Sequence, residues 1–292
     1  MKIILFSRQG LAFGRKELCA LRDAVQKFGF DYAVNEEFAA VLRQEADWVI
    51  PAQNCYGAQL GPQPAEAVMV CYGGDGTLLA GVHRMGEERI PVVGINAGHL
   101  GFLTGDSHHE VERIFEAIQA GTLRYEERTM LKVEGDFVRT PSSSLALNEF
   151  SIQRNGAGVL SIEAWVDGQM VATYLGDGVI VSTPTGSTAY SLSAGGPVVA
   201  PTCACFVISP LAPHNLTMRP VVIPDSSVVK LKLRIRHAEA FVTLDDRSYP
   251  ILQDGQFTIQ RAERPIFLAV PHNISFYDTL RNKMMWGMDI RG

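Results

Sequence analysis

Short apolar runs alternate with amphipathic segments along the first part of the chain. The runs with the length of buried strands are 2–6, 48–50, 67–71 and 91–95. Between them, apolar residues recur at three- and four-residue spacing over 18–28 and again over 111–118, as on one face of a helix. This alternation predicts an α/β N-terminal domain with helices packed on a parallel, Rossmann-like sheet.

The period changes in the second part of the chain. From Val229 to Arg236, apolar and cationic residues alternate strictly, as in a strand with one solvated face. Turn signals recur at Gly135, Asn155-Gly156, Asp167-Gly168 and Asp254-Gly255. Such a cadence of strands and turns favours an all-β, sandwich-like C-terminal domain. We therefore expect an α/β domain over 1–124, a β-rich domain over 125–270, and a C-terminal segment over 271–292 that returns to the first domain.

Composition narrows the class of protein further. The 292 residues are 47% hydrophobic and 20% charged, which is typical of a globular protein with two domains. A net charge of -5 argues against a nucleic-acid surface. Five scattered cysteines indicate reduced thiols, and no run approaches the length of a membrane span or of a signal-peptide core. We expect a cytoplasmic protein.

A glycine-rich loop follows the predicted strand 67–71. It reads Gly73-Gly74-Asp75-Gly76-Thr77, and helical periodicity begins again at Leu78. Glycines let the backbone approach a phosphate closely, and the N-terminus of a helix offers free N–H groups. A plain turn is the alternative, and the loop matches neither the dinucleotide-binding nor the P-loop signature.

Asp75 is unusual because a carboxylate in an anion-binding loop repels phosphate. A carboxylate is favourable in such a loop when it holds a divalent cation or accepts a proton from an attacking hydroxyl. Phosphoryl transfer requires both tasks. Helix capping by Asp75 is the competing interpretation.

The chain resembles the NAD kinase family, bacterial type, on several motifs. The GGDGT loop at 73–77 is shared with diacylglycerol and sphingosine kinases, whereas the stretch 183–197, TPTGSTAYSLSAGGP, is similar to a motif peculiar to NAD kinases. Asn148-Glu149 and Gly176-Asp177-Gly178 match the family at its spacing. Further matches are 213–216, Arg219-Pro220, Thr279-Leu280 and Trp286-Gly287.

This resemblance implies a fold, a reaction and a set of site residues. The reaction is transfer of the γ-phosphoryl group of ATP to the adenosine ribose 2′-hydroxyl of NAD, which gives NADP, with Mg²⁺ or another divalent cation. Asp75 would be the proton acceptor, and Gly73, Gly74 and Thr77 would form the phosphate loop. The residues implied to bind NAD are Asp75, Gly76, Asn148, Glu149, Asp177, Thr188, Ala189, Tyr190, Ser191, Leu192, Ser193 and Arg247. Family members form homodimers or homotetramers through the C-terminal domain, and neither nucleic acid nor a membrane is expected as a partner.

Some features depart from the family or stay open. Arg247, in a turn where relatives show a different sequence, either meets a dinucleotide phosphate or pairs with Asp246. Leu175 stands where some relatives carry a basic residue. His83 and His99 flank the loop region and could contact phosphate, although a lone histidine is more often structural, and His108-His109 suits a helix start better than a metal. A lipid kinase and a non-catalytic NAD sensor are the alternative functions, and ATP and polyphosphate are both candidate donors.

Overall fold

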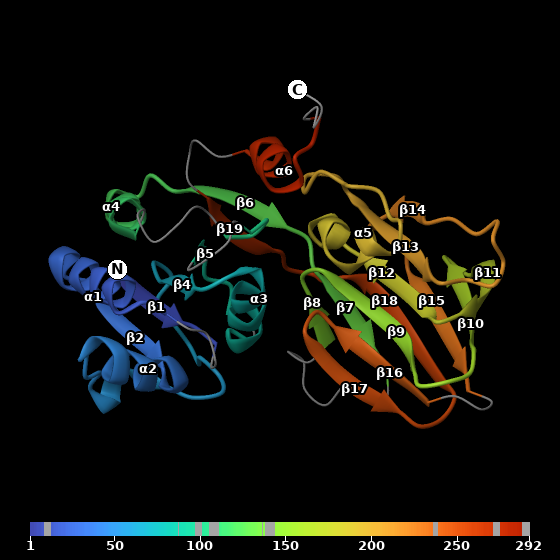
Figure 1. Cartoon of the computed structure of the whole chain (residues 1–292), viewed down its shortest axis with the longest axis horizontal. Helices are drawn as coiled ribbons and strands as arrows, with labels where there is room; N and C mark the ends of the chain where they lie inside the picture. The colour runs from blue at the N-terminus through green and yellow to red at the C-terminus, as the bar shows by residue number, and fades with distance from the viewer. Residues whose placement is uncertain are drawn as a thin grey trace. The chain divides into compact units, whose positions relative to one another are not determined.

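The computed structural model describes residues 1–8, 13–86, 88–96, 101–104, 111–135, 137, 144–235, 239–270 and 275–287. It divides the chain into two compact units (Figure 1). The first unit comprises Met1–Glu127 together with Ile266–Gly292, and the second comprises Arg128–Pro265.

A seven-stranded sheet forms the centre of the first unit, with the strand order β3-β2-β1-β4-β5-β19-β6. The strands are β1 (Lys2–Phe6), β2 (Asp31–Asn35), β3 (Cys55–Tyr56), β4 (Val68–Tyr72), β5 (Val92–Ile95), β6 (Arg124–Arg128) and β19 (Ile266–Val270). All pairings from β3 to β19 are parallel. The predicted Rossmann-like parallel sheet is confirmed.

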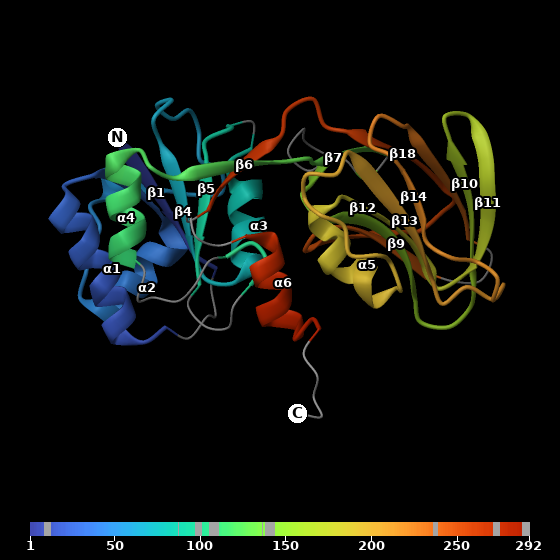
Figure 2. The ribbon, with the colours of Figure 1, turned by 90° about the horizontal axis from the view of Figure 1, so that it is seen from above.

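Helices cover this sheet on both faces. The helices of the first unit are α1 (Arg15–Phe28), α2 (Glu36–Ala46), α3 (Asp75–Arg84), α4 (Val111–Ala120) and α6 (Phe276–Met284), with the 3-10 turn η1 (Ala52–Asn54). Alternate residues of β1 point to opposite faces, so Ile3 and Leu5 join the core formed with α1, α2 and α4. Phe6 faces α3, where a Cβ on Gly81 would lie 3.2 Å from its ring. Figure 2 shows α1 and α4 side by side, in agreement with their packing.

Two six-stranded antiparallel sheets make up the second unit, with the orders β11-β10-β15-β18-β7-β8 and β14-β13-β12-β9-β16-β17. The elements are β7 (Leu131–Glu134), β8 (Leu145–Ala146), β9 (Glu149–Asn155), β10 (Leu160–Val166), β11 (Gln169–Gly176), β12 (Gly178–Ser182), η4 (Thr185–Thr188), α5 (Tyr190–Ser193), β13 (Cys205–Leu211), β14 (Val221–Pro224), β15 (Val229–Arg234), β16 (Glu239–Leu244), β17 (Arg247–Ile251) and β18 (Gly255–Arg261). Side chains from both sheets, such as Phe150 of β9 and Leu231 of β15, share one buried core. This is the expected β-sandwich.

The elements differ from the predictions at several places. Residues 266–270, expected in the β-rich domain, form β19 of the parallel sheet. Residues 48–50 form no strand, because α2 ends in the left-handed Asp47 and the buried Trp48 only follows that cap. Strand β2 was not predicted, because its ends, Asp31 and Asn35, are polar and its apolar centre is only three residues long.

Two further observations concern the chain as a whole. None of the helices in the described ranges has the length and apolarity that crossing a membrane requires.

All five cysteines are free, and burial raises the pKa of the Cys71 thiol well above its usual range.

Candidate functional site

The GGDGT loop joins β4 directly to α3. Gly73 has φ +150°, and a Cβ there would lie 2.3 Å from Thr77 Oγ1, so this position requires glycine. Gly74 is the N-cap of α3 and no side chain caps the helix, which begins at Asp75, three residues before the expected start at Leu78. The loop therefore offers backbone groups to a ligand, and phosphate binding at the N-terminus of a helix uses backbone N–H groups.

The carboxylate of Asp75 holds the segment 101–104. Oδ2 accepts a hydrogen bond from Phe102 N at 2.8 Å. Oδ1 accepts from Leu103 N at 3.0 Å, from Thr104 N at 3.1 Å and from Thr104 Oγ1 at 3.2 Å. A Cβ on Gly101 would lie only 1.9 Å from Oδ1. Asp75 thus organises a second loop, a role that neither helix capping nor the sequence pattern indicated.

Two cationic side chains lie at the same loop. Lys283 Nζ, from α6, is 3.6 Å from Asp75 Oδ2 and 4.6 Å from the centre of the Phe102 ring. Arg8 Nη1 donates to Gly76 O at 3.4 Å. Sequence reasoning missed both residues, because neither lies near the GGDGT motif in the chain. Their positive charge suits a phosphorylated ligand.

In the second unit, Asn148 and Glu149 form a buried polar pair at the start of β9. Each residue is only 8% exposed. Asn148 Oδ1 and Glu149 Oε2 are buried and accept no hydrogen bond from any described residue. Burial, together with the nearby charge of Asp245, raises the pKa of Glu149 to about 8. Buried polar atoms without partners are costly, and these two oxygens can take part in hydrogen bonds to a polar ligand.

The NAD-kinase-like stretch 183–197 lies against this pair. Thr183 N donates to Asn148 O at 2.9 Å, and Thr183 Oγ1 donates to Leu147 O at 2.6 Å. Gly186 packs so closely that a Cβ would lie 2.2 Å from Asn148 O. The two motifs, far apart in sequence, therefore form one structural feature.

The other residues expected to bind NAD from this stretch lie on η4, on α5 and, for Ala189, between the two. Ser191 is buried, with Oγ 3.0 Å from Ser209 Oγ, whereas Tyr190 is exposed and its hydroxyl donates to Gln153 Oε1 at 3.5 Å. Thr188 Oγ1 donates to Thr185 O at 3.4 Å. Ala189 and Leu192 are half-buried, and Ser193 is exposed.

Arg247 and Asp177 occupy different places in this unit. Arg247 Nη2 donates to Leu145 O. This contact is neither the phosphate contact nor the pairing with Asp246 that the sequence left open. Asp177 precedes β12 and pairs with Arg154 at 2.5 Å. It lies at the opposite end of β12 from Ser182, which pairs with Glu149. The structure therefore brings Asn148, Glu149 and the 183–191 stretch together and leaves Asp177 at the far end of the strand.

The histidines and other candidate metal ligands form no cluster within the described ranges. His83 lies in the last turn of α3, away from Asp75 at its start. His99, His108 and His109 fall outside the described residues.

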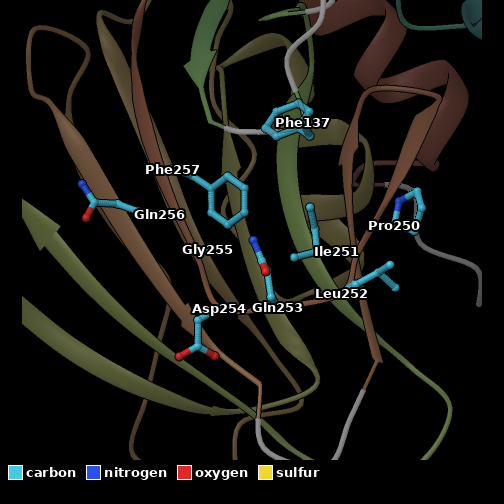
Figure 3. A pocket seen from close by; sticks show the side chains of 9 residues that line it. All are labelled: Phe137, Pro250, Ile251, Leu252, Gln253, Asp254, Gly255, Gln256 and Phe257. Carbon is cyan, nitrogen blue, oxygen red and sulfur yellow. The ribbon is translucent and has the colours of Figure 1, made fainter.

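A cavity of about 300 Å³ lies elsewhere in the second unit, around the β17–β18 connection. It is lined by Phe137, Pro250, Ile251, Leu252, Gln253, Asp254, Gly255, Gln256 and Phe257, and Figure 3 shows the two phenylalanine rings close to each other at its wall. None of the predicted site residues lines it, so it is separate from the polar pair.

Comparison with known proteins agrees with these motifs. Residues 62–123 match the family model of the ATP-NAD kinase N-terminal domain, and residues 147–271 match that of the ATP-NAD kinase C-terminal domain. Proteins named NAD kinase are similar over the whole chain. That of Bacteroides fragilis is 35% identical over 292 residues, with 100% of both chains covered, and that of Porphyromonas gingivalis is 35% identical over 291 residues, with 99% of each covered.

Solved structures share the fold. Yeast NADH kinase complexed with NADH superposes with a TM-score of 0.85 at 22% identity, covering 100% of this chain and 89% of the other. An NAD kinase from Archaeoglobus fulgidus in complex with ATP has a TM-score of 0.69 at 25% identity, with 98% of each chain covered. Both domain models, the full-length relatives and the motifs agree, and the chain belongs to the ATP-NAD kinase family.

Proposed function

We propose that this protein transfers the γ-phosphoryl group of ATP to the adenosine ribose 2′-hydroxyl of NAD and so forms NADP. The observation that carries the proposal is the buried, unpartnered pair of oxygens on Asn148 and Glu149 within a segment that belongs to the family's C-terminal domain. Amide and carboxyl groups suit the polar edge of a base and the vicinal hydroxyls of a ribose. The relatives named NAD kinase and the Archaeoglobus fulgidus enzyme in complex with ATP support the same substrates.

Asp75 is our candidate for the proton acceptor. A ribose hydroxyl is a poor nucleophile at neutral pH and must lose its proton as the bond to phosphorus forms. Oδ1 of Asp75 already accepts three hydrogen bonds, whereas Oδ2 accepts one and faces Lys283. Oδ2 therefore retains the capacity to accept the proton of the substrate hydroxyl.

Gly73, Gly74 and Thr77 would hold phosphate at the start of α3. Gly73 and Gly74 leave the backbone open, and the helix N-terminus favours negative charge. Arg8 and Lys283 add positive charge beside it. The loop can thus align the donor without a lysine of its own.

A divalent cation, Mg²⁺, is part of the proposal. Mg²⁺ is commonly bound by one or two carboxylates together with substrate phosphates, and Asp75 is the carboxylate of the loop that fits this role. When bound, the cation neutralises charge on the transferred phosphoryl group. The chain's own contribution is to orient Asp75 through the 101–104 segment.

We further propose a cytoplasmic homodimer or homotetramer. Five free cysteines suit a reducing compartment. The edge strands β11 and β14 of the second unit expose apolar side chains, including Met170, Leu175 and Val222. Exposed apolar edges favour association with another chain.

The test is NADP formation by the purified protein with NAD as acceptor and ATP, GTP or polyphosphate as donor. We expect NADP with ATP and its loss on chelation of divalent cations. Diacylglycerol offered beside NAD distinguishes the lipid-kinase alternative, and binding of NAD without any NADP from any donor would instead indicate a sensor. Unchanged activity after chelation would refute the metal requirement.

A further inference from the structure

Asp245 forms a compact set of hydrogen bonds with the Asn148-Glu149 segment. It follows β16, whose pairing with β9 ends at Leu244 and Phe150. Its Oδ2 accepts from Leu147 N at 2.8 Å, and its Oδ1 accepts from Asn148 N at 2.7 Å and from Glu149 N at 3.1 Å. Asp245 N donates in return to Glu149 O at 3.0 Å. The turn after β16 thus binds three consecutive residues of the segment.

The opposite side of the same segment is held by the 183–186 stretch. Thr183 and Ser182 bind the carbonyl groups of Leu147 and Asn148, and Gly186 packs against the Asn148 carbonyl. The N–H groups therefore face Asp245, and the carbonyls of Leu147 and Asn148 face β12 and η4. With the backbone fixed on both sides, the side chains of Asn148 and Glu149 stay in place with their free oxygens available.

A carboxylate fits this position better than any other side chain. Three backbone donors converge on two oxygens, and an ionised carboxylate offers acceptors only. An asparagine would retain one acceptor oxygen and direct an NH₂ group at a backbone N–H. Asp245 also has φ +52°, a left-handed conformation that aspartate and asparagine tolerate better than most residues.

We infer that Asp245 is a positioning residue for NAD, which sets the affinity for the dinucleotide by holding Asn148 and Glu149 in the binding conformation. This inference rests on the proposed function. Because Asp245 acts through the backbone of the segment, its removal should change binding of NAD more than the chemical step.

The charge of Asp245 gives the inference a second observable. Burial is the larger cause of the raised pKa of Glu149, and Asp245 is the charged neighbour that raises it further. Among the neighbouring elements, β12 places the uncharged Ser182 opposite Glu149. The guanidinium of Arg247, on β17, donates from Nη2 to Leu145 O. Replacement of Asp245 by a neutral residue should therefore let Glu149 ionise at lower pH.

The experiment compares D245N with D167N. Asp167 is a matched control because it also has a left-handed backbone, φ +50°, and its carboxylate also accepts from a backbone group, Val228 N at 2.8 Å. It lies between β10 and β11 in the other sheet. Steady-state NADP formation is measured for both variants between about pH 6 and 9, together with thermal unfolding, and E149Q and D245N/E149Q complete the set.

We expect D245N to raise the KM for NAD about tenfold, as loss of roughly one charge-assisted hydrogen bond would. Its kcat and its KM for ATP should stay within about twofold, and D167N should leave all three near wild-type values. The pH dependence of the KM for NAD should move to lower pH in D245N, and it should be the same in D245N/E149Q as in E149Q.

A D245N variant whose KM for NAD and pH profile match those of the wild type would overturn the inference. So would an increase in KM that D167N reproduces, since it would then reflect general destabilisation. Failure of the proposed function is distinguishable, because in that case the wild-type protein itself forms no NADP.

Discussion

Lys283 Nζ lies 3.6 Å from Oδ2 of Asp75, although the lysine is near the C-terminus and the aspartate is in the N-terminal part of the chain. The same ammonium group lies 4.6 Å from the centre of the Phe102 ring. Lys283 therefore contacts both the carboxylate of the GGDGT loop and the segment that this carboxylate holds. The helix α6 is thereby part of the candidate phosphate site in the first unit.

Replacement of Lys283 by methionine should lower kcat/KM about tenfold, because it removes a charge contact at the Asp75 carboxylate while retaining most of the side-chain volume. Arg281→Met is the matched control, since Arg281 lies on the same helix and pairs with Asp278 at the surface. Steady-state kinetics of both variants provide the measurement. We expect Lys283→Arg to recover part of the activity, and equal effects of K283M and R281M would contradict a specific role for Lys283.

We expect that Gly101 does not tolerate a side chain. A Cβ there would lie 1.9 Å from Asp75 Oδ1 and 2.3 Å from Thr104 Oγ1, so Gly101→Ala must displace the carboxylate from its hydrogen bonds. Activity should fall by at least about tenfold. Gly57→Ala is the control, because its Cβ would meet only the Glu36 carboxylate at an ordinary 3.6 Å. A G101A enzyme as active as G57A would show that the Asp75 geometry is unimportant.

Glu149 should make the stability of the folded protein depend on pH. Its pKa is raised to about 8 in the folded state, whereas an unfolded glutamate ionises at about 4.3. Between these values the unfolded state binds fewer protons than the folded state, so stability falls as pH rises towards 8. Each unit of such a shift corresponds to about 1.4 kcal/mol.

The substitution Glu149→Gln removes this titration. Thermal unfolding without substrate should therefore show E149Q gaining stability relative to the wild type as pH increases from about 5 to 8. A difference between the two melting temperatures that is constant over this range would mean that Glu149 does not retain its proton in the fold.

Much of the fold could be predicted because hydrophobic periodicity reports burial directly. The runs at 2–6, 67–71 and 91–95 became β1, β4 and β5, and the helical spacing over 18–28 became α1. The order of an α/β part followed by a β-rich part was correct. The sequence did not predict that residues 266–270 leave the β-rich domain and form β19 of the parallel sheet, because an apolar run does not reveal which sheet it joins.

The site was only partly accessible to sequence reasoning. Motif resemblance predicted Asp75 and the Asn148-Glu149 pair as site residues, and the structure places this pair against the 183–186 stretch. The supporting contacts of Asp245 and Lys283 could not be predicted, because they depend on turns and helices that come together only in the folded chain. Local propensity and spacing contain no information about such distant contacts.

The most direct test of the central claim is the variant Asp75→Asn. The claim is that the Asp75 carboxylate accepts the proton of the ribose hydroxyl during phosphoryl transfer. Single-turnover NADP formation should fall at least about a hundredfold, as for loss of a general base. Binding of NAD, measured by calorimetry, and thermal unfolding should stay close to those of the wild type. A D75N enzyme that binds NAD and forms NADP at a near-normal rate would contradict the account.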